Sequence, residues 1–107
     1  MAKIVWSPRA IKDINELAEY IAKDSLQYAK AQTRLFIEMA EDLEAHPHKG
    51  RIVPELGING IRQLLCGHYR IIYEVSTKMI AILTVHHQAR LLKNTPSATI
   101  KRYLRKK

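Results

Sequence analysis

The feature that most constrains the fold of this chain is a block of three strand-like segments that follow one another almost without interruption. Apolar, aromatic and β-branched residues dominate 61–66, 69–75 and 79–86, with Gly67 and the tripeptide 76–78 marking the turns between them. Parallel neighbours need a connection of a dozen or more residues, so connections this short can join only antiparallel strands. We therefore expect an antiparallel β-meander in the second half of the chain.

A first amphipathic helix is predicted near the amino terminus, after a short strand at 3–6. Ser7 and Pro8 supply an N-cap and a proline at the first helical position, and the helix should end near Lys23. Apolar residues then recur at helical spacing. The stripe expected to face the core is Ile11, Ile14, Leu17, Ala18 and Ile21.

A second helix should follow directly, capped by Asp24 or Ser25. It must stop by His46, because Pro47 disfavours helical geometry in the residue before it. Its expected inner stripe is Tyr28, Ala31, Leu35, Met39 and Leu43.

The whole chain of 107 residues fits one domain. Proline and glycine residues make 48–60 a loop, and Thr95–Pro96 repeats the cap-then-proline signal and could open a short final helix in the basic tail at 96–107. The predicted fold is α+β: β-α-α-β-β-β, an antiparallel sheet with both long helices on one face. The other face is then expected to be open to a ligand.

Charge is distributed unevenly along this basic chain, which has a formal net charge of +8. Eight of the ten acidic residues lie between Asp13 and Glu44, and the last acidic residue is Glu74. Such a field favours phosphate polymers or an acidic protein partner, the alternative being a basic protein that is merely soluble. The cations that follow without any carboxylate are Lys78, Arg90, Lys93, Lys101, Arg102, Arg105, Lys106 and Lys107.

Several classes of protein and site are disfavoured by what the sequence contains. Cys66 is the single cysteine, so no internal disulfide can form, which suits a reducing cytoplasm. No signal peptide is visible, and no apolar run approaches the roughly 20 residues of a membrane-spanning helix. Metal-ligand spacing, a glycine-rich phosphate loop and a nucleophile elbow are not found. We expect a cytoplasmic protein without metal or cofactor.

Polar residues in and beside the predicted sheet could carry chemistry. Alternation along 69–75 places Arg70 with Ile72 and Glu74 on one face. An arginine is costly to bury without a partner, so Arg70 is expected to point into the open face of the sheet. One of the two histidines at the end of the last strand should reach the same side. The full set is Glu55, Arg62, Arg70, His86, His87 and Arg90.

These residue types fit RNA cleavage without a metal, which needs a base, a cationic phosphate clamp and an acid. Glu55 could be the base, Arg70 with Arg62 the clamp, and His87 the acid. The structural alternative is that Arg70 pairs with Glu74 or Glu55 and that His87 only ends a strand.

The order and spacing of several short motifs resemble the RelE/ParE superfamily of bacterial toxins. The resemblance spans about residues 4–92 and implies a toxin neutralised by a small antitoxin wrapped around it. The motifs that carry it are Ile-Val-Trp-Ser-Pro at 4–8, His46-Pro47, 50–55, Ile-Arg-Gln-Leu at 61–64, Tyr-Arg-Ile-Ile-Tyr-Glu-Val at 69–75 and Val-His-His-Gln-Ala-Arg at 85–90.

The superfamily contains messenger RNA endonucleases that act on the ribosome. The resemblance to the YoeB-like subset implies catalytic roles for Glu55, Arg70 and His87, although Gln88 stands where that subset has a tyrosine. The RelE-type lysine pair is reduced to Arg62, and Gln88 also occupies the position of a second catalytic arginine. The substrate-binding residues implied are Arg62, His86, Gln88 and Arg90.

ParE-type members lack the nuclease set and poison DNA gyrase. Their last strand often ends in a histidine before polar residues, as 85–88 does here. We therefore expect a growth-inhibiting toxin that acts as a metal-independent messenger RNA endonuclease at the ribosome, with a gyrase poison as the alternative. Its partners would be an antitoxin and either messenger RNA on the ribosome or gyrase. A non-toxic nucleic-acid-binding module is the third alternative.

Overall fold

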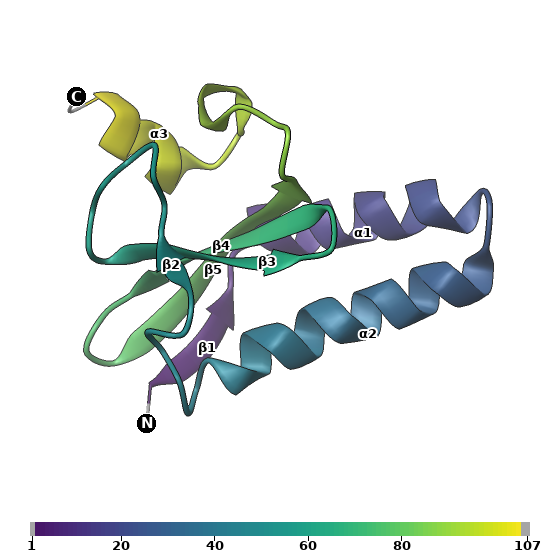
Figure 1. Ribbon diagram of the computed structural model, residues 1–107, viewed down its shortest axis with the longest axis horizontal. Helices are drawn as coiled ribbons and strands as arrows, with labels where there is room; N and C mark the ends of the chain where they lie inside the picture. Colours follow the sequence, from purple (N-terminus) through teal and green to yellow (C-terminus); the bar gives the residue numbers. More distant parts are fainter. Residues whose placement is uncertain (1, 106–107) are drawn as a thin grey trace.

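A mixed five-stranded sheet in the order β1-β5-β4-β3-β2 forms the centre of the computed structural model, which describes residues 2–105 (Figure 1). Met1 and the last two residues of the predicted basic tail, Lys106 and Lys107, lie outside the described residues. The strands are β1 (Lys3–Trp6), β2 (Arg51–Ile52), β3 (Ile61–Cys66), β4 (Tyr69–Val75) and β5 (Met79–His87). The helices are α1 (Pro8–Ala22), α2 (Leu26–Asp42), the 3-10 helix η1 (Leu92–Asn94) and α3 (Ala98–Arg105).

The predicted α+β fold is confirmed, with one difference in the sheet. Strands β3, β4 and β5 form the expected antiparallel meander. Strand β1, however, pairs in parallel with β5, from Lys3 opposite Met79 to Trp6 opposite Ile82, so the sheet is mixed. The long connection through both helices lets β1 return beside β5 in the same direction. The short strand β2 adds a second edge beside β3, inside the segment expected to be loop.

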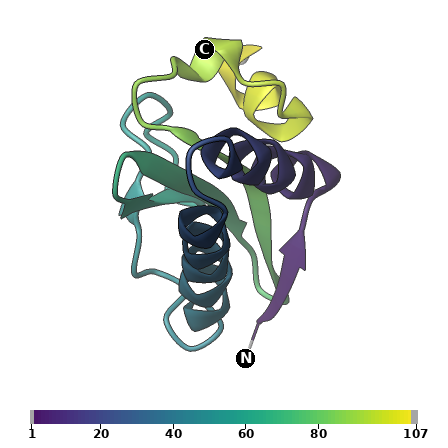
Figure 2. The ribbon, with the colours of Figure 1, turned by 90° about the vertical axis from the view of Figure 1, so that its right-hand side faces the viewer.

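Helices α1 and α2 form a hairpin that projects beyond the sheet, and α2 lies below the sheet in Figures 1 and 2. Ser7 caps α1 as predicted: its hydroxyl accepts a hydrogen bond from the backbone N–H of Ala10 at 3.0 Å. The same hydroxyl donates to the carbonyl oxygen of Leu83 at 3.0 Å, which ties the start of α1 to β5. None of the helices within residues 2–105 is long and apolar enough to cross a membrane.

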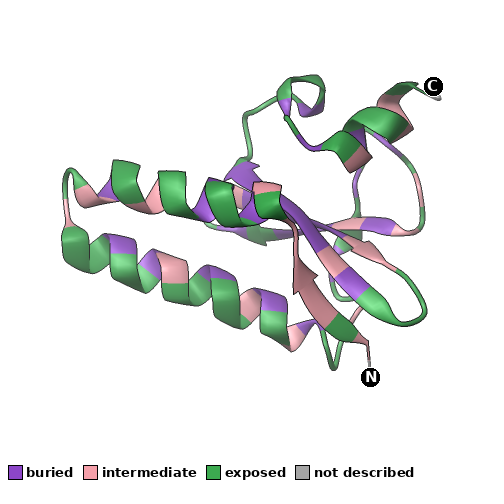
Figure 3. Cartoon of the chain, turned by 180° about the vertical axis from the view of Figure 1, so that it is seen from behind, coloured by how far each residue is buried: buried purple, intermediate pink, exposed green. Residues whose placement is uncertain are grey.

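The inner stripe predicted for α2 is wrong by one position at Tyr28, Ala31 and Leu35, whereas Met39 and Leu43 pack in the core as expected. Tyr28 and Leu35 are 57% and 44% exposed, whereas Phe36 is buried against the edge of the Tyr69 ring, with ring centroids 5.6 Å apart. Both stripes have helical spacing, so only the packing against the sheet selects between them. The buried positions, visible as the purple side of the helix in Figure 3, are Ala29, Gln32, Phe36 and Ala40, followed by Leu43 just past the helix end.

In α1 the predicted stripe is confirmed at Ile14 and Ile21, which are buried, but Ile11 is 50% exposed and Asp13 is buried. Asp13 accepts hydrogen bonds from the Thr84 hydroxyl and from the backbone N–H of Val85, the latter at 3.0 Å. Strand β1 ends opposite Ile82, so β5 has no strand neighbour on that edge beyond this point. The carboxylate therefore satisfies a backbone donor that would otherwise be buried without a partner.

The second face of the sheet is not open, contrary to the sequence-based expectation. Helix α3 lies above the sheet (Figures 1 and 2). Together with the loop after β2 it covers this face, and apolar side chains of the strands, the loop and the C-terminal segment form a second apolar cluster. Ser97, not Thr95, caps α3, since the Ser97 carbonyl oxygen accepts from the N–H of Lys101 at 3.0 Å. The buried members of this cluster are Val53, Leu56, Ile61, Ile72, Leu83, Leu92 and Ile100.

Replacement of Ile100 by alanine should show that this segment is part of the folded core. The Ile100 side chain is fully buried in the second cluster, and truncating a buried isoleucine to alanine typically costs about 2–5 kcal/mol. We expect Ile100→Ala to lower the free energy of unfolding in urea by that amount. The control is Lys101→Ala on the exposed side of α3, for which a change within about 0.5 kcal/mol is expected. Equal stabilities of the two variants would contradict the docking of α3.

Candidate functional site

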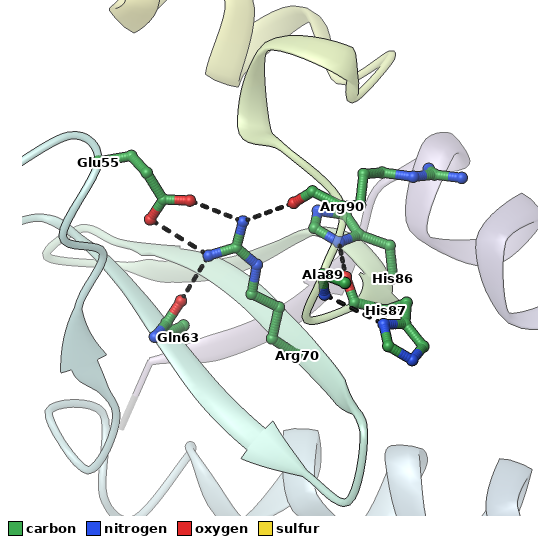
Figure 4. A network of polar contacts seen from close by, with 7 residues as sticks. All are labelled: Glu55, Gln63, Arg70, His86, His87, Ala89 and Arg90. Carbon is green, nitrogen blue, oxygen red and sulfur yellow. Dashed lines mark hydrogen bonds and ion pairs between the residues drawn. The ribbon is translucent and has the colours of Figure 1, made fainter.

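Arg70 is the centre of a polar network on the second face of the sheet (Figure 4). Its guanidinium pairs with both oxygens of Glu55: Nη2 donates to Oε2 at 2.9 Å and Nη1 to Oε1 at 3.3 Å. Nη1 also donates to the side-chain oxygen of Gln63 at 3.0 Å, and Nη2 to the backbone carbonyl of Arg90 at 3.3 Å. Only 6% of the Arg70 side chain is exposed. The arginine is therefore buried and paired, as the structural alternative predicted.

Glu55 reaches Arg70 from the loop between β2 and β3, and 40% of its side chain is exposed. The hydrogen bonds from Arg70 hold the pKa of the Glu55 carboxyl below its usual range, although partial burial acts in the opposite direction. Glu55 is thus ionised at neutral pH and has a reduced affinity for a proton. A carboxylate in this state is a weaker general base than a free one.

Gln63 belongs to the network but was missed by the sequence analysis. It lies opposite Ile72 across β3 and β4, on the face that carries Arg70. Its side chain is buried, and its amide oxygen accepts one of the Arg70 donors. The strand alternation contained the signal, because a glutamine two residues after Ile61 shares the sheet face of that apolar residue.

His86 is the histidine that lies beside Arg70, since the two residues are directly opposite each other in β4 and β5. Its ring is buried, and its Nδ1 lies 3.0 Å from the carbonyl oxygen of His87. A carbonyl can only accept, so Nδ1 carries the proton and Nε2 is an acceptor in the neutral ring. Nε2 is buried without a hydrogen-bond partner among residues 2–105. Burial lowers the pKa of His86, and the charges of Arg70 and Arg90 lower it further, so the ring is neutral at pH 7.

His87 points to the opposite side of the strand from the Arg70 guanidinium (Figure 4). It lies opposite Tyr69, stacks on His68 with ring centroids 6.0 Å apart, and its Nδ1 accepts from the N–H of Ala89 at 3.0 Å. The cause is a β-bulge: Ile72 pairs with Thr84 and the next residue of β4 with Ile82, so β5 carries one extra residue. Beyond the bulge the alternation is reversed.

The remaining predicted residues have partners of their own. Arg62 donates to the carbonyl oxygen of Gly50 at 2.8 Å, and the Gln88 amide donates to that of Gly67 at 2.6 Å. The Arg90 side chain is exposed and extends away from the network, which it enters only through its carbonyl (Figure 4). The structure therefore brings Glu55, Arg70 and His86 together. His87, Arg62 and the Gln88 side chain lie outside this set.

Beside His86 the surface is only slightly hollowed. A hollow of about 150 Å³ lies between α1 and the end of β5, lined in part by His86, His87 and Arg90. Sites for small molecules usually measure about 300–1,000 Å³. Within residues 2–105, no group of three or more histidine, cysteine, aspartate or glutamate side chains is placed to hold a metal ion. The ion pair between Arg70 and Glu55 has no net charge, and it attaches the loop after β2 to the sheet.

Solved structures with the same fold include toxins from three bacteria. The chromosomal ParDE toxin–antitoxin system of P. aeruginosa aligns with a TM-score of 0.68 and 20% identity, over 81% of this chain and 96% of that chain. The RelBE2 toxin–antitoxin complex of Mycobacterium tuberculosis aligns with a TM-score of 0.59 and 21% identity, over 81% of this chain and 98% of that chain. The YoeB dimer of Staphylococcus aureus aligns with a TM-score of 0.57 and 16% identity, over 81% of this chain and 97% of that chain. These likenesses establish the fold.

Comparison of sequences adds the family. Toxin RelE2 of Caulobacter vibrioides is 29% identical over 92 residues, which cover 85% of this chain and the whole of that protein. The family described as the ParE toxin of the type II toxin–antitoxin system parDE matches residues 4–92. Since this match takes in both long helices and the entire meander, the chain belongs to the ParE toxin family, within the RelE/ParE superfamily of type II toxin–antitoxin systems.

Proposed function

We propose that this toxin arrests growth as a ParE-type poison of DNA gyrase and does not cleave RNA. The observation that carries the proposal is the two-pronged ion pair between Arg70 and Glu55. Metal-independent RNA cleavage would require a base, a phosphate clamp and an acid. In this structure the expected base, Glu55, and the expected clamp, Arg70, are bound to each other.

Each step of RNA cleavage lacks a suitably placed group in this arrangement. A phosphate could reach Arg70 only after Glu55 leaves it, and the ion pair lowers the pKa of the intended base. The intended acid, His87, lies on the other side of β5. A general acid and a general base each contribute typically 10²- to 10⁴-fold to a rate. An inhibitor that works through a binding surface needs neither group.

An endoribonuclease is the second candidate, and the position of His86 favours it. Glu55, Arg70 and His86 approach one another on one face, and the Nε2 atom of His86 is an acceptor without a partner in residues 2–105. If substrate phosphate displaced Glu55 from Arg70, the neutral imidazole could accept a proton from a ribose hydroxyl. In this reading His86, and not His87, supplies the histidine.

Three variants separate these two functions: Glu55→Gln, His86→Gln and His87→Gln. If the toxin poisons gyrase, cells that express any of the three should still stop growing, with intact transcripts and an induced DNA-damage response. Purified gyrase should lose supercoiling activity in the presence of each folded variant. Circular dichroism of each variant provides the control for folding.

A ribonuclease would behave differently in the same experiment. Loss of a general acid or base should reduce cleavage by about 10²- to 10⁴-fold, and growth should then be tolerated. Transcript ends that map to ribosome positions with the unmodified chain, and disappear in Glu55→Gln and either histidine variant, would overturn the gyrase proposal.

The antitoxin is the partner of a toxin of this kind, and we propose that it binds the outer side of the helical hairpin. A groove of about 610 Å³ runs between α1 and α2, where small and apolar residues that include Ala22, Leu26 and Ala29 are flanked by the charged residues Glu19, Lys30, Arg34 and Glu38. Ile37 lines both this groove and a neighbouring hollow of about 320 Å³ that contains Ile11. Exposed apolar grooves of this shape accept the apolar face of an amphipathic helix.

A further inference from the structure

The segment after residue 92 lies beyond the part of the chain that the family matches, and it carries the strongest charge imbalance of the structure. From 75 to 105 the chain contains cations and no carboxylate. Helix α3, within this segment, is a rigid element, because its buried residue Ile100 is anchored in the second apolar cluster. The side of α3 that carries the charges is therefore turned away from the cluster.

The two sides of α3 differ completely in character. Ile100, Tyr103 and Leu104 pack toward the sheet, and the Tyr103 hydroxyl donates to the Glu74 carboxylate at 2.9 Å. The opposite stripe follows the helical spacing of three, four and seven residues and is exposed. It consists of Ala98, Lys101, Arg102 and Arg105.

The cations of this stripe are not neutralised by the protein. Within residues 2–105, neither Lys101, Arg102 nor Arg105 makes an ion pair with a carboxylate. Glu74, which contacts α3, already accepts from Tyr103. Arg90 and Lys93, both exposed, precede the helix in the chain and add to the positive charge of this segment.

We propose that the exposed stripe of α3 binds the phosphate backbone of duplex DNA without reading its sequence. The row from Lys101 to Arg105 extends about 6 Å along the helix, and each DNA strand presents one phosphate per about 3.4 Å of its axis, so the row matches two neighbouring phosphates. Single-stranded RNA or DNA is usually held by aromatic stacking, and this stripe contains no aromatic residue. The stripe contains no asparagine or glutamine, the residues that read adenine, and its lysine and arginines are residue types that commonly contact phosphates.

This surface lies outside the Arg70 network, so the inference does not depend on whether the toxin acts on gyrase or on RNA. The experiment uses the full chain of 107 residues and a fluorescently labelled DNA duplex, with affinity measured by anisotropy at several salt concentrations. Each phosphate contact contributes about 0.9 to the slope of log affinity against log salt. Replacing Lys101, Arg102 and Arg105 by glutamine removes the contacts to two phosphates and should therefore reduce that slope by about 2.

A matched variant controls for net charge. Replacing the exposed residues Lys12, Lys23 and Lys30 by glutamine removes the same three charges from the helical hairpin, and the slope should stay as in the unmodified chain. The exchange Lys101→Arg, Arg102→Lys and Arg105→Lys should preserve binding. Equal losses in both glutamine variants, an unchanged slope in the α3 variant, or tighter binding of single-stranded RNA than of the duplex would each overturn the proposal.

Discussion

Expression of this chain without its antitoxin should stop the growth of a bacterial host and reduce colony formation by orders of magnitude. The expectation follows from membership of the ParE toxin family, whose match covers residues 4–92. Co-expression of the small protein encoded next to the toxin gene should restore growth, because antitoxin binding removes the free toxin by mass action. Growth curves and colony counts after induction measure both effects. Normal growth at verified soluble expression would contradict the assignment of toxicity.

A variant in the helical groove makes the same experiment sharper. Ile37 is 39% exposed and lines both hollows on the outer side of the hairpin. Ile37→Glu places a charge at the centre of the proposed antitoxin interface and leaves the Arg70 network unchanged. We expect this variant to remain toxic and to resist rescue. Full rescue of Ile37→Glu would place the antitoxin on another surface, while leaving the toxic activity itself unaffected.

Replacement of Arg70 by alanine should destabilise the protein by about 2–4 kcal/mol at neutral pH. Removing one partner of a buried ion pair typically costs about 3–5 kcal/mol, and the partial exposure of Glu55 reduces that cost. Gln63 and the Arg90 carbonyl also lose their donor. Chemical denaturation followed by circular dichroism measures the change. A variant that is as stable as the unmodified chain and yet non-toxic would instead identify Arg70 as a catalytic clamp.

The pH dependence of stability provides an independent check on the same ion pair. The pKa of Glu55 is lower in the folded protein than its ordinary value of 4.5, so the unfolded chain binds a proton first as the pH falls. The contribution of the pair is therefore complete above about pH 4.5 and is lost as the pH falls toward the folded-state pKa. We expect the stability difference between the unmodified chain and Arg70→Ala to shrink in that acidic range. A difference that stays constant down to about pH 3 would contradict this role of Glu55.

Local patterns in the sequence were sufficient to predict the long helices and the meander, although the short strand β2 was missed. The short turns at 67–68 and 76–78 allow only antiparallel pairing, and β3, β4 and β5 form accordingly. The Ser7–Pro8 signal starts α1, and Ser25 caps α2 with its hydroxyl accepting from the N–H of Tyr28 at 3.1 Å. These features depend on neighbours within a few residues, which a sequence displays directly.

The inner faces of the helices and the cover of the sheet depended on contacts between distant residues. In α2 the stripes through Leu35 and through Phe36 are equally helical, and packing against Tyr69 selects the second. The second face of the sheet is buried because Ile100, far along the chain, completes a cluster with Ile72. No local pattern in the sequence predicts that an amphipathic C-terminal helix packs its apolar side against that face of the sheet.

The candidate site divides in the same way. Alternation along β4 was enough to predict that Arg70 and Tyr69 point to opposite faces, because each residue of a strand reverses the direction of the side chain. The choice between His86 and His87 was made by the bulge opposite Ile72, where one extra residue in β5 reverses the alternation for everything that follows. A bulge is an adjustment between two paired strands, and so neither strand's sequence contains it alone. The sequence by itself determined which side chains were available, and the tertiary structure decided which of them meet.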